Sequence, residues 1–178
     1  MRKLAQTMVG APFVAEIKMT DPAQAKETET LYRQAGAQAE AAGPNLKISG
    51  DLGKVLLQAV DDADDLFNEQ GGKLEAQYHY DPKKVLKNWW YSFSKLGAAM
   101  TKKKKFNLAK AITEVQARAL EPGYNFAGIA PYKVSDKAFL LGVMLAFYIF
   151  YTLFYGFGIY ELFEGLGLQM EKSTKEEF

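Results

Sequence analysis

The feature that most constrains this chain is an uncharged run of 23 residues, 138–160, near its C-terminal end. As an α-helix, this run would be about 34 Å long, enough to cross a hydrocarbon core of roughly 30 Å. The alternative is the buried core helix of a soluble protein, where uncharged apolar runs beyond about 18 residues seldom occur. We therefore expect a transmembrane helix over residues 135–168, beginning with Ser135 as a cap and Asp136 in the first turn.

The charges that flank this run predict its orientation. Lys133 and Lys137 precede it, and residues 102–105 are four consecutive lysines, whereas the tail at 169–178 contains only two lysines. Lys and Arg resist translocation across a membrane. The part of the chain before the run is therefore expected on the cytoplasmic side, or on the matrix or stromal side in an organelle.

The residue types inside the run predict contact with other helices. Two tyrosines lie near its middle, where lipid offers no hydrogen-bond partner for a phenol hydroxyl. Small residues recur at helical spacing along it, and such a pattern lets a second helix approach closely. A plain anchor with incidental glycines is the alternative. The residues expected to pack against neighbouring transmembrane helices are Gly142, Ala146, Tyr148, Tyr151, Thr152 and Gly156.

Ahead of this run, the apolar periodicity predicts helices and no strand. Helices are expected at residues 22–42, 51–68, 82–100 and 107–120. The low apolar content of the first 48 residues predicts an extended arm with an exposed helix. The expected fold is thus all-α, with an N-terminal arm at 1–48, a soluble-side helical region at 49–121, a juxtamembrane loop at 122–134, the transmembrane helix at 135–168 and a polar tail at 169–178.

Two adjacent tryptophans, Trp89 and Trp90, lie within the helix expected at 82–100. Neighbouring side chains on a helix point in different directions, so both rings cannot lie on one narrow stripe. At least one is expected to face a second surface, either another protein or a membrane interface. A core tryptophan beside a half-exposed one is the alternative. Both residues are the soluble-side contact candidates.

The sequence contains no pattern typical of a catalytic or metal site. It has no cysteine, which excludes a thiolate ligand or nucleophile, and His79 is its only histidine. The acidic cluster lacks the calcium-loop spacing and lies in an expected amphipathic helix, so a solvated acidic face is predicted. The members of that cluster are Asp61, Asp62, Asp64, Asp65 and Glu69. We expect no enzymatic activity, no cofactor and no bound metal.

The charge balance gives no case for nucleic acid as a partner. Lys and Arg total 22 against 21 Asp and Glu, a net charge of +1. The lysines at 102–105 could contact lipid headgroups or an acidic protein, and a solvated charge run is the alternative.

A resemblance to a known family is found at the apolar run. Residues 137–142 read KAFLLG, and an aromatic-rich stretch then reaches FYG at 154–156. These roughly 20 residues resemble the C-terminal helix of mitochondrial ATP synthase subunit g. That family usually has a glutamate near its Tyr-Gly element and Gly-Arg soon after, whereas here Phe157 and Gly158 follow and the first glutamate is Glu161. The resemblance implies a non-catalytic inner-membrane subunit that helps to shape or dimerise a complex.

These features together predict an accessory or structural subunit of a multi-subunit membrane complex. The mitochondrial inner membrane is favoured, with a respiratory complex or ATP synthase as the assembly, and thylakoid or bacterial inner membranes are the alternatives. The expected partners are other subunits and membrane lipids. The competing function is a membrane-tethered helical binding module that recruits a soluble protein, and it predicts that residues 1–132 fold alone.

Overall fold

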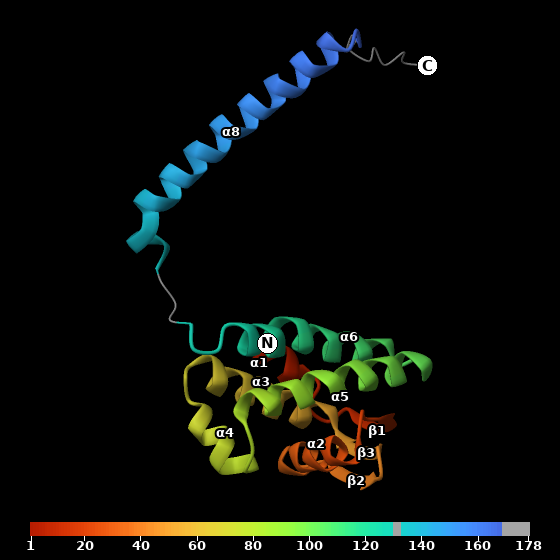
Figure 1. Cartoon of the computed structure of the whole chain (residues 1–178). Helices are drawn as coiled ribbons and strands as arrows, with labels where there is room; N and C mark the ends of the chain where they lie inside the picture. Colours follow the sequence, from red (N-terminus) through yellow and green to blue (C-terminus); the bar gives the residue numbers. More distant parts are fainter. Residues whose placement is uncertain (130–132, 169–178) are drawn as a thin grey trace. The chain divides into compact units, whose positions relative to one another are not determined.

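The computed structural model describes residues 1–129 and 133–168 (Figure 1). The chain divides into two units, Met1–Ile129, called the domain below, and Ala130–Phe178. The described residues are mostly helical, as the periodicity predicts. The domain nevertheless contains a small sheet, so the expectation of an all-α fold is wrong. The expected tail at 169–178 and part of the expected loop at 122–134 lie outside the described residues.

The sheet has three antiparallel strands in the order β1-β3-β2. Its strands are β1 (Pro12–Lys18), β2 (Gln38–Ala42) and β3 (Asn45–Asp51). In β1, Phe13, Ala15 and Ile17 are buried and the residues between them are exposed, which is the alternation of a half-buried strand. Gly43, with φ of +61°, allows the two-residue turn between β2 and β3.

Residues 1–48 belong to the core and are not an extended arm. They contribute Phe13, Leu31 and Tyr32, each no more than 1% exposed. The helix expected at 22–42 ends at Gln34 as α2 (Pro22–Gln34), and the alanine-rich residues beyond it form β2. Alanine favours a helix in an isolated segment, but here Ala39 is buried in the sheet. Tertiary packing therefore overrides the local preference.

The helices expected at 51–68 and 82–100 are present as α3 (Leu52–Phe67) and α5 (Pro82–Lys102), whereas α1 and α4 were not expected. Asp51 and Asp81 cap α3 and α5 by accepting hydrogen bonds from the Gly53 and Lys84 amides, both at 2.8 Å. The helix expected to stop at residue 120 continues through a π-helical segment and past Pro122. The bounds are α1 (Arg2–Thr7), α3 (Leu52–Phe67), α4 (Gly71–Tyr78), α5 (Pro82–Lys102), α6 (Phe106–Val115), η1 (Gln116–Leu120) and α7 (Glu121–Asn125).

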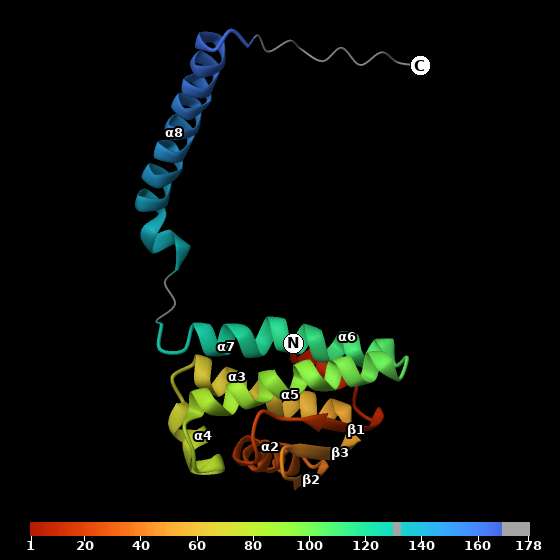
Figure 2. The ribbon, with the colours of Figure 1, turned by 45° about the vertical axis from the view of Figure 1, so that its right-hand side comes forward.

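The core of the domain is built around α5, which contacts α2, α3, α6 and β1 (Figure 2). Trp89 of α5 is fully buried, and its ring packs edge to face on Tyr32 at 5.1 Å and on Phe93 at 5.4 Å between centroids. Helix α6 returns antiparallel beside α5. One hydrophobic core therefore joins the sheet and the helices into a single packed body.

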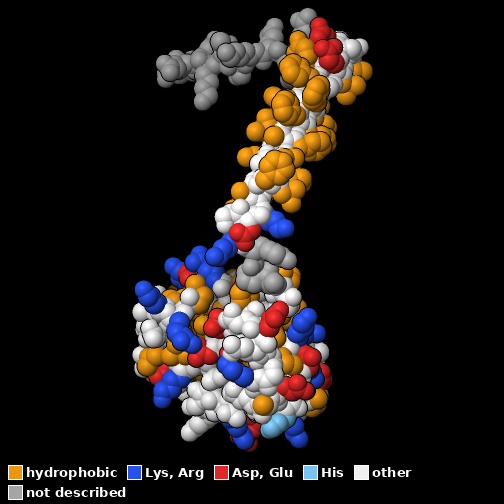
Figure 3. Space-filling model, turned by 90° about the vertical axis from the view of Figure 1, so that its left-hand side faces the viewer, with side chains coloured by type: hydrophobic (Ala, Val, Ile, Leu, Met, Phe, Trp, Pro, Cys, Tyr) orange, Lys and Arg blue, Asp and Glu red, His pale blue; other side chains and the backbone are white. Residues whose placement is uncertain are grey.

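The second unit contains a 3₁₀ turn, η2 (Val134–Lys137), and α8 (Ala138–Gly165) of 28 residues. Together, Val134–Gly165 form the one helix of the described ranges that is long and apolar enough to cross a membrane. The α-helical part starts after Lys137 without a side-chain cap, so the predicted capping by Ser135 is wrong. No residue of α8 is buried, and hydrophobic side chains cover the face seen in Figure 3.

Candidate functional site

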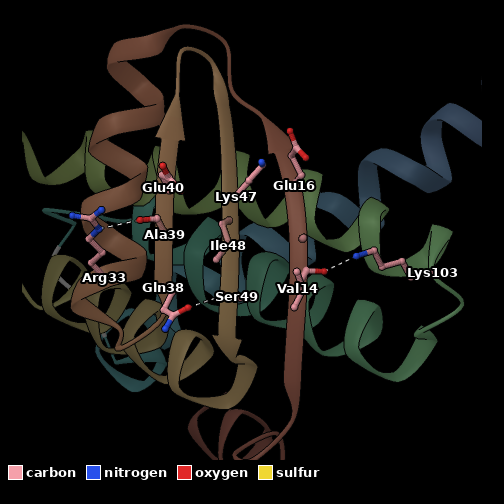
Figure 4. Close-up of a pocket in the computed structure, with 11 residues that line it drawn as sticks. Val14, Glu16, Arg33, Gln38, Ala39, Glu40, Lys47, Ile48, Ser49 and Lys103 are labelled. Carbon is pink, nitrogen blue, oxygen red and sulfur yellow. Dashed lines mark hydrogen bonds between the residues drawn. The ribbon is translucent and has the colours of Figure 1, made fainter.

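The outer face of the sheet carries an open groove of about 660 Å³ (Figure 4). The inner face packs on the core, so alternate residues of each strand point outward and line the groove. Arg33 of α2 and Lys103 at the end of α5 lie at its two sides. The outward side chains are Val14 and Glu16 of β1, Gln38 and Glu40 of β2, and Lys47 and Ser49 of β3.

The charges in the groove are arranged around Lys47. The strand register places Lys47 opposite Glu16 on one side and opposite Glu40 on the other. Residues directly opposite each other in an antiparallel sheet lie close enough to interact. The centre therefore holds two carboxylates and one ammonium group, a net charge of −1. Lys103 gives one side of the groove a basic character, whereas Arg33 on the other side is paired with Glu29.

Basic side chains also cover carbonyl groups on both edge strands. Lys103 Nζ donates to the Val14 carbonyl at 2.7 Å, and Arg33 Nε donates to the Ala39 carbonyl at 3.0 Å. An uncovered edge strand is a template for pairing with another strand. The groove therefore offers side-chain recognition rather than strand addition. The lysine run at 102–105 is not simply solvated, because Lys103 and Lys105 both reach carbonyls of β1.

Replacing both Arg33 and Lys103 with alanine is expected to increase self-association of the full chain in detergent, because it frees one carbonyl on each edge strand for pairing with another strand. Sedimentation velocity at several protein concentrations would reveal the change. Lys18→Ala, which removes an exposed charge from β1, is the control. Identical sedimentation of the double variant and the wild type would show that the two side chains do not protect the edges.

The acidic cluster contains a buried carboxylate that the sequence does not reveal. Asp62 is 2% exposed, so the expectation of a solvated face is wrong for this residue. Its Oδ2 accepts hydrogen bonds from Trp89 Nε1 and from the Tyr78 hydroxyl, each at 2.7 Å, and its Oδ1 accepts one from Gln58 Nε2 at 2.8 Å. Burial raises the pKa of Asp62, and the three hydrogen bonds act against that rise.

The contacts of the Asp62 carboxylate indicate a structural role. Both oxygens are engaged by donors of the same domain, and the side chain is enclosed. It links α3, α4 and α5 by one set of hydrogen bonds. Within the described ranges, no group of three or more acidic or histidine side chains could hold a metal ion. His79 has φ of +62° and ends α4 in a left-handed conformation.

The six contact residues predicted in the apolar run do not share one face of α8. At about 100° per residue, Gly142, Ala146 and Gly156 fall within roughly 80° of one another. Tyr151 points to the opposite side, where it stacks between Phe147 and Tyr155 at centroid distances of 6.3 and 6.2 Å. The helix thus has a small-residue face, on which Ile149 and Leu153 also lie, and an aromatic face opposite to it.

Two of the six residues lie between these faces. The Thr152 hydroxyl donates to the Tyr148 carbonyl at 2.8 Å, so it is satisfied within the helix. Tyr148 is 64% exposed and projects its ring away from the small residues. Close approach of a second helix is therefore best supported at Gly142, Ala146 and Gly156, where an added Cβ would meet no atom of the chain at either glycine.

The two tryptophans have different environments. Trp89 is a core residue with no exposed surface, so it is not available for a soluble-side contact. Trp90 is 40% exposed and donates from Nε1 to Glu121 at 2.9 Å. The pair is thus a core tryptophan beside a half-exposed one, the alternative that the helical spacing left open.

Sequence reasoning missed the groove because it missed the strands. The alternation typical of a half-buried strand is present in β1, where Phe13, Ala15 and Ile17 alternate with exposed residues. This pattern spans only seven positions. Comparisons with models of protein families, with curated proteins and with solved structures find no match. The function is therefore inferred from the geometry of each of the two units.

Proposed function

We propose that this chain is a membrane-tethered binding module. The domain, residues 1–129, recruits a partner on one side of a membrane, and α8 holds it there. The observation that carries this proposal is the contrast between the two units. The domain has a continuous core of its own, whereas α8 is apolar on all sides with no residue buried. A helix of that kind needs lipid or other protein around it.

The groove on the sheet is the proposed recruitment surface. Its volume of about 660 Å³ lies within the range of binding sites, and its walls combine polar and apolar surface. Lys47 lies at the centre of the groove, Lys103 lies at one side, and Arg33, which is paired with Glu29, lies at the other. An acidic segment of a soluble partner is the proposed occupant, because its carboxylates would meet the ammonium groups of Lys47 and Lys103. The flanking lysines favour placing the domain on the cytoplasmic, matrix or stromal side.

The experiment that tests this function is mild-detergent extraction from native membranes through an affinity tag on the C-terminal tail. Native electrophoresis and mass spectrometry then identify what migrates with the chain. We expect a soluble partner whose recovery falls several-fold when Lys47 is replaced by glutamate, because the centre of the groove then carries three acids. Lys54→Glu, on the exposed side of α3, is the matched charge control.

A second candidate function is a non-catalytic accessory subunit of a membrane complex. The distribution of residues on α8 favours it, because a small-residue face permits helix packing and two phenols lie near the middle of the apolar run. The resemblance to ATP synthase subunit g supports the mitochondrial inner membrane as its location. In the same electrophoresis, migration in a large stoichiometric assembly would favour this function and count against recruitment of a soluble partner.

A further inference from the structure

Four exposed apolar side chains lie on α5, on α7 and in the residues that follow α7 at the end of the domain. Trp90 of α5 is 40% exposed, Tyr124 of α7 is 41% exposed, and Phe126 and Ile129 in the following turn are 51% and 56% exposed. We call these four residues the exit patch. Trp90 and Tyr124 also line a cavity of about 350 Å³, whose walls include Leu86 and Leu120. Most of the exposed lining of this cavity is apolar.

The exit patch contains residue types that are typical of a membrane interface. Tryptophan and tyrosine are enriched at the level of the headgroups, where the ring is buried and the polar tip stays wet. Trp90 already has its indole nitrogen paired with Glu121, and Lys87 lies on the wall of the same cavity. A lysine beside exposed aromatic rings can reach a lipid phosphate while its stem covers apolar surface.

The length of the chain limits how far the exit patch can be from a membrane. Only residues 130–133 separate Ile129 from Val134, the first residue of the candidate span. Even a fully extended chain covers at most about 18 Å over that interval. If α8 crosses a membrane, the last residue of the exit patch is therefore held within that distance of the start of the span.

We propose that the exit patch inserts into the headgroup layer of the membrane that α8 crosses. This inference depends on the proposed function, because it requires α8 to be the anchor. The occupant of the patch is the lipid interface. The aromatic rings of Trp90 and Tyr124 and the side chains of Phe126 and Ile129 are buried among the headgroups, and Lys87 contacts phosphate. The domain is then held against the bilayer by contacts of its own as well as by the linker.

Tryptophan fluorescence can test this proposal, because both tryptophans of the chain lie in the domain and α8 contains none. The full chain is reconstituted into phosphatidylcholine vesicles whose acyl chains carry bromine, a short-range quencher of tryptophan fluorescence, and into unbrominated vesicles. We expect brominated lipid to reduce the emission of the wild type. Trp90→Phe retains only the buried Trp89, and it should show no loss. The difference between the two chains isolates the contribution of Trp90.

Two further variants test the rest of the patch. Combined Tyr124→Ser and Phe126→Ser should weaken the quenching of Trp90, whereas Phe106→Ser, which removes an exposed aromatic ring at the start of α6, should leave it unchanged. Flotation after carbonate treatment is measured on the same vesicles. A chain that fails to float overturns the anchor and the patch together. A chain that floats but shows no quenching, or shows equal quenching in Trp90→Phe, overturns the patch alone and leaves its surface to a protein partner.

Discussion

Replacing both Ile149 and Leu153 with arginine is expected to release the chain from membranes. Both residues lie near the middle of α8 and are about half exposed, at 51% and 54%. An arginine at the centre of a transmembrane helix costs roughly 3 kcal/mol of insertion free energy, so the pair costs about 6 kcal/mol. Carbonate extraction should then move the chain from the membrane pellet to the supernatant.

The control for this experiment places the same charges at the end of the helix. Leu166→Arg combined with Leu168→Arg adds two arginines beyond α8, where long basic side chains can reach the interface. That variant should stay in the membrane pellet. Retention of the Ile149 and Leu153 double variant would instead show that something other than lipid burial of α8 holds the chain, and the proposed anchor would be wrong.

Asp62→Ala is expected to destabilise the domain by about 3 kcal/mol, because the buried donors of Trp89 and Tyr78 lose their acceptor. Relief of a buried charge offsets part of that loss. The total free energy of unfolding of a domain is roughly 5–15 kcal/mol, so the expected loss is a large fraction of it. Urea unfolding of the full chain in detergent, followed by tryptophan fluorescence, gives the free energy of unfolding. An unchanged midpoint would show that these hydrogen bonds do not stabilise the fold.

Asp62→Asn is the matched control, and its behaviour depends on pH. The amide retains an acceptor for Trp89 and Tyr78, and it can donate to Gln58 once that side chain flips. Because burial raises the pKa of Asp62 in the folded state, the folded protein binds this proton more tightly than the unfolded chain. The resulting stability is complete below the unfolded pKa of about 3.9 and is lost as pH rises through the folded value. The free energy of unfolding of Asp62→Asn should therefore increase relative to that of the wild type as pH rises from acidic to neutral.

Long segments with strong local signals were predictable from the sequence. Helices α3 and α5 follow the expected apolar spacing and begin beside their aspartate caps, Asp51 and Asp81. These signals repeat over 16 and 21 residues, so they do not depend on distant contacts. The same holds for α8, whose apolar content is continuous.

The candidate site was not predictable in the same way. The groove depends on strands of five and seven residues, one of which is built from alanines that also suit a helix. Lys47 becomes a central charge only through the register that places Glu16 and Glu40 on either side. Likewise, the exit patch joins Trp90 to Tyr124, more than thirty positions apart, through the packing of α5 beside α7.

The long apolar helix, the amphipathic helices α3 and α5, and the separation of a polar region from an apolar one all follow from the sequence alone. Each of these is encoded by neighbouring residues through periodicity and composition. Three other features required the packed structure: the strands and core contacts of the first 51 residues, the enclosure of Asp62 beside an exposed Asp61, and the burial of Trp89 beside an exposed Trp90. Those outcomes depend on which distant side chains fill the space around each residue, and burial of that kind is a property of the packed chain rather than of any segment.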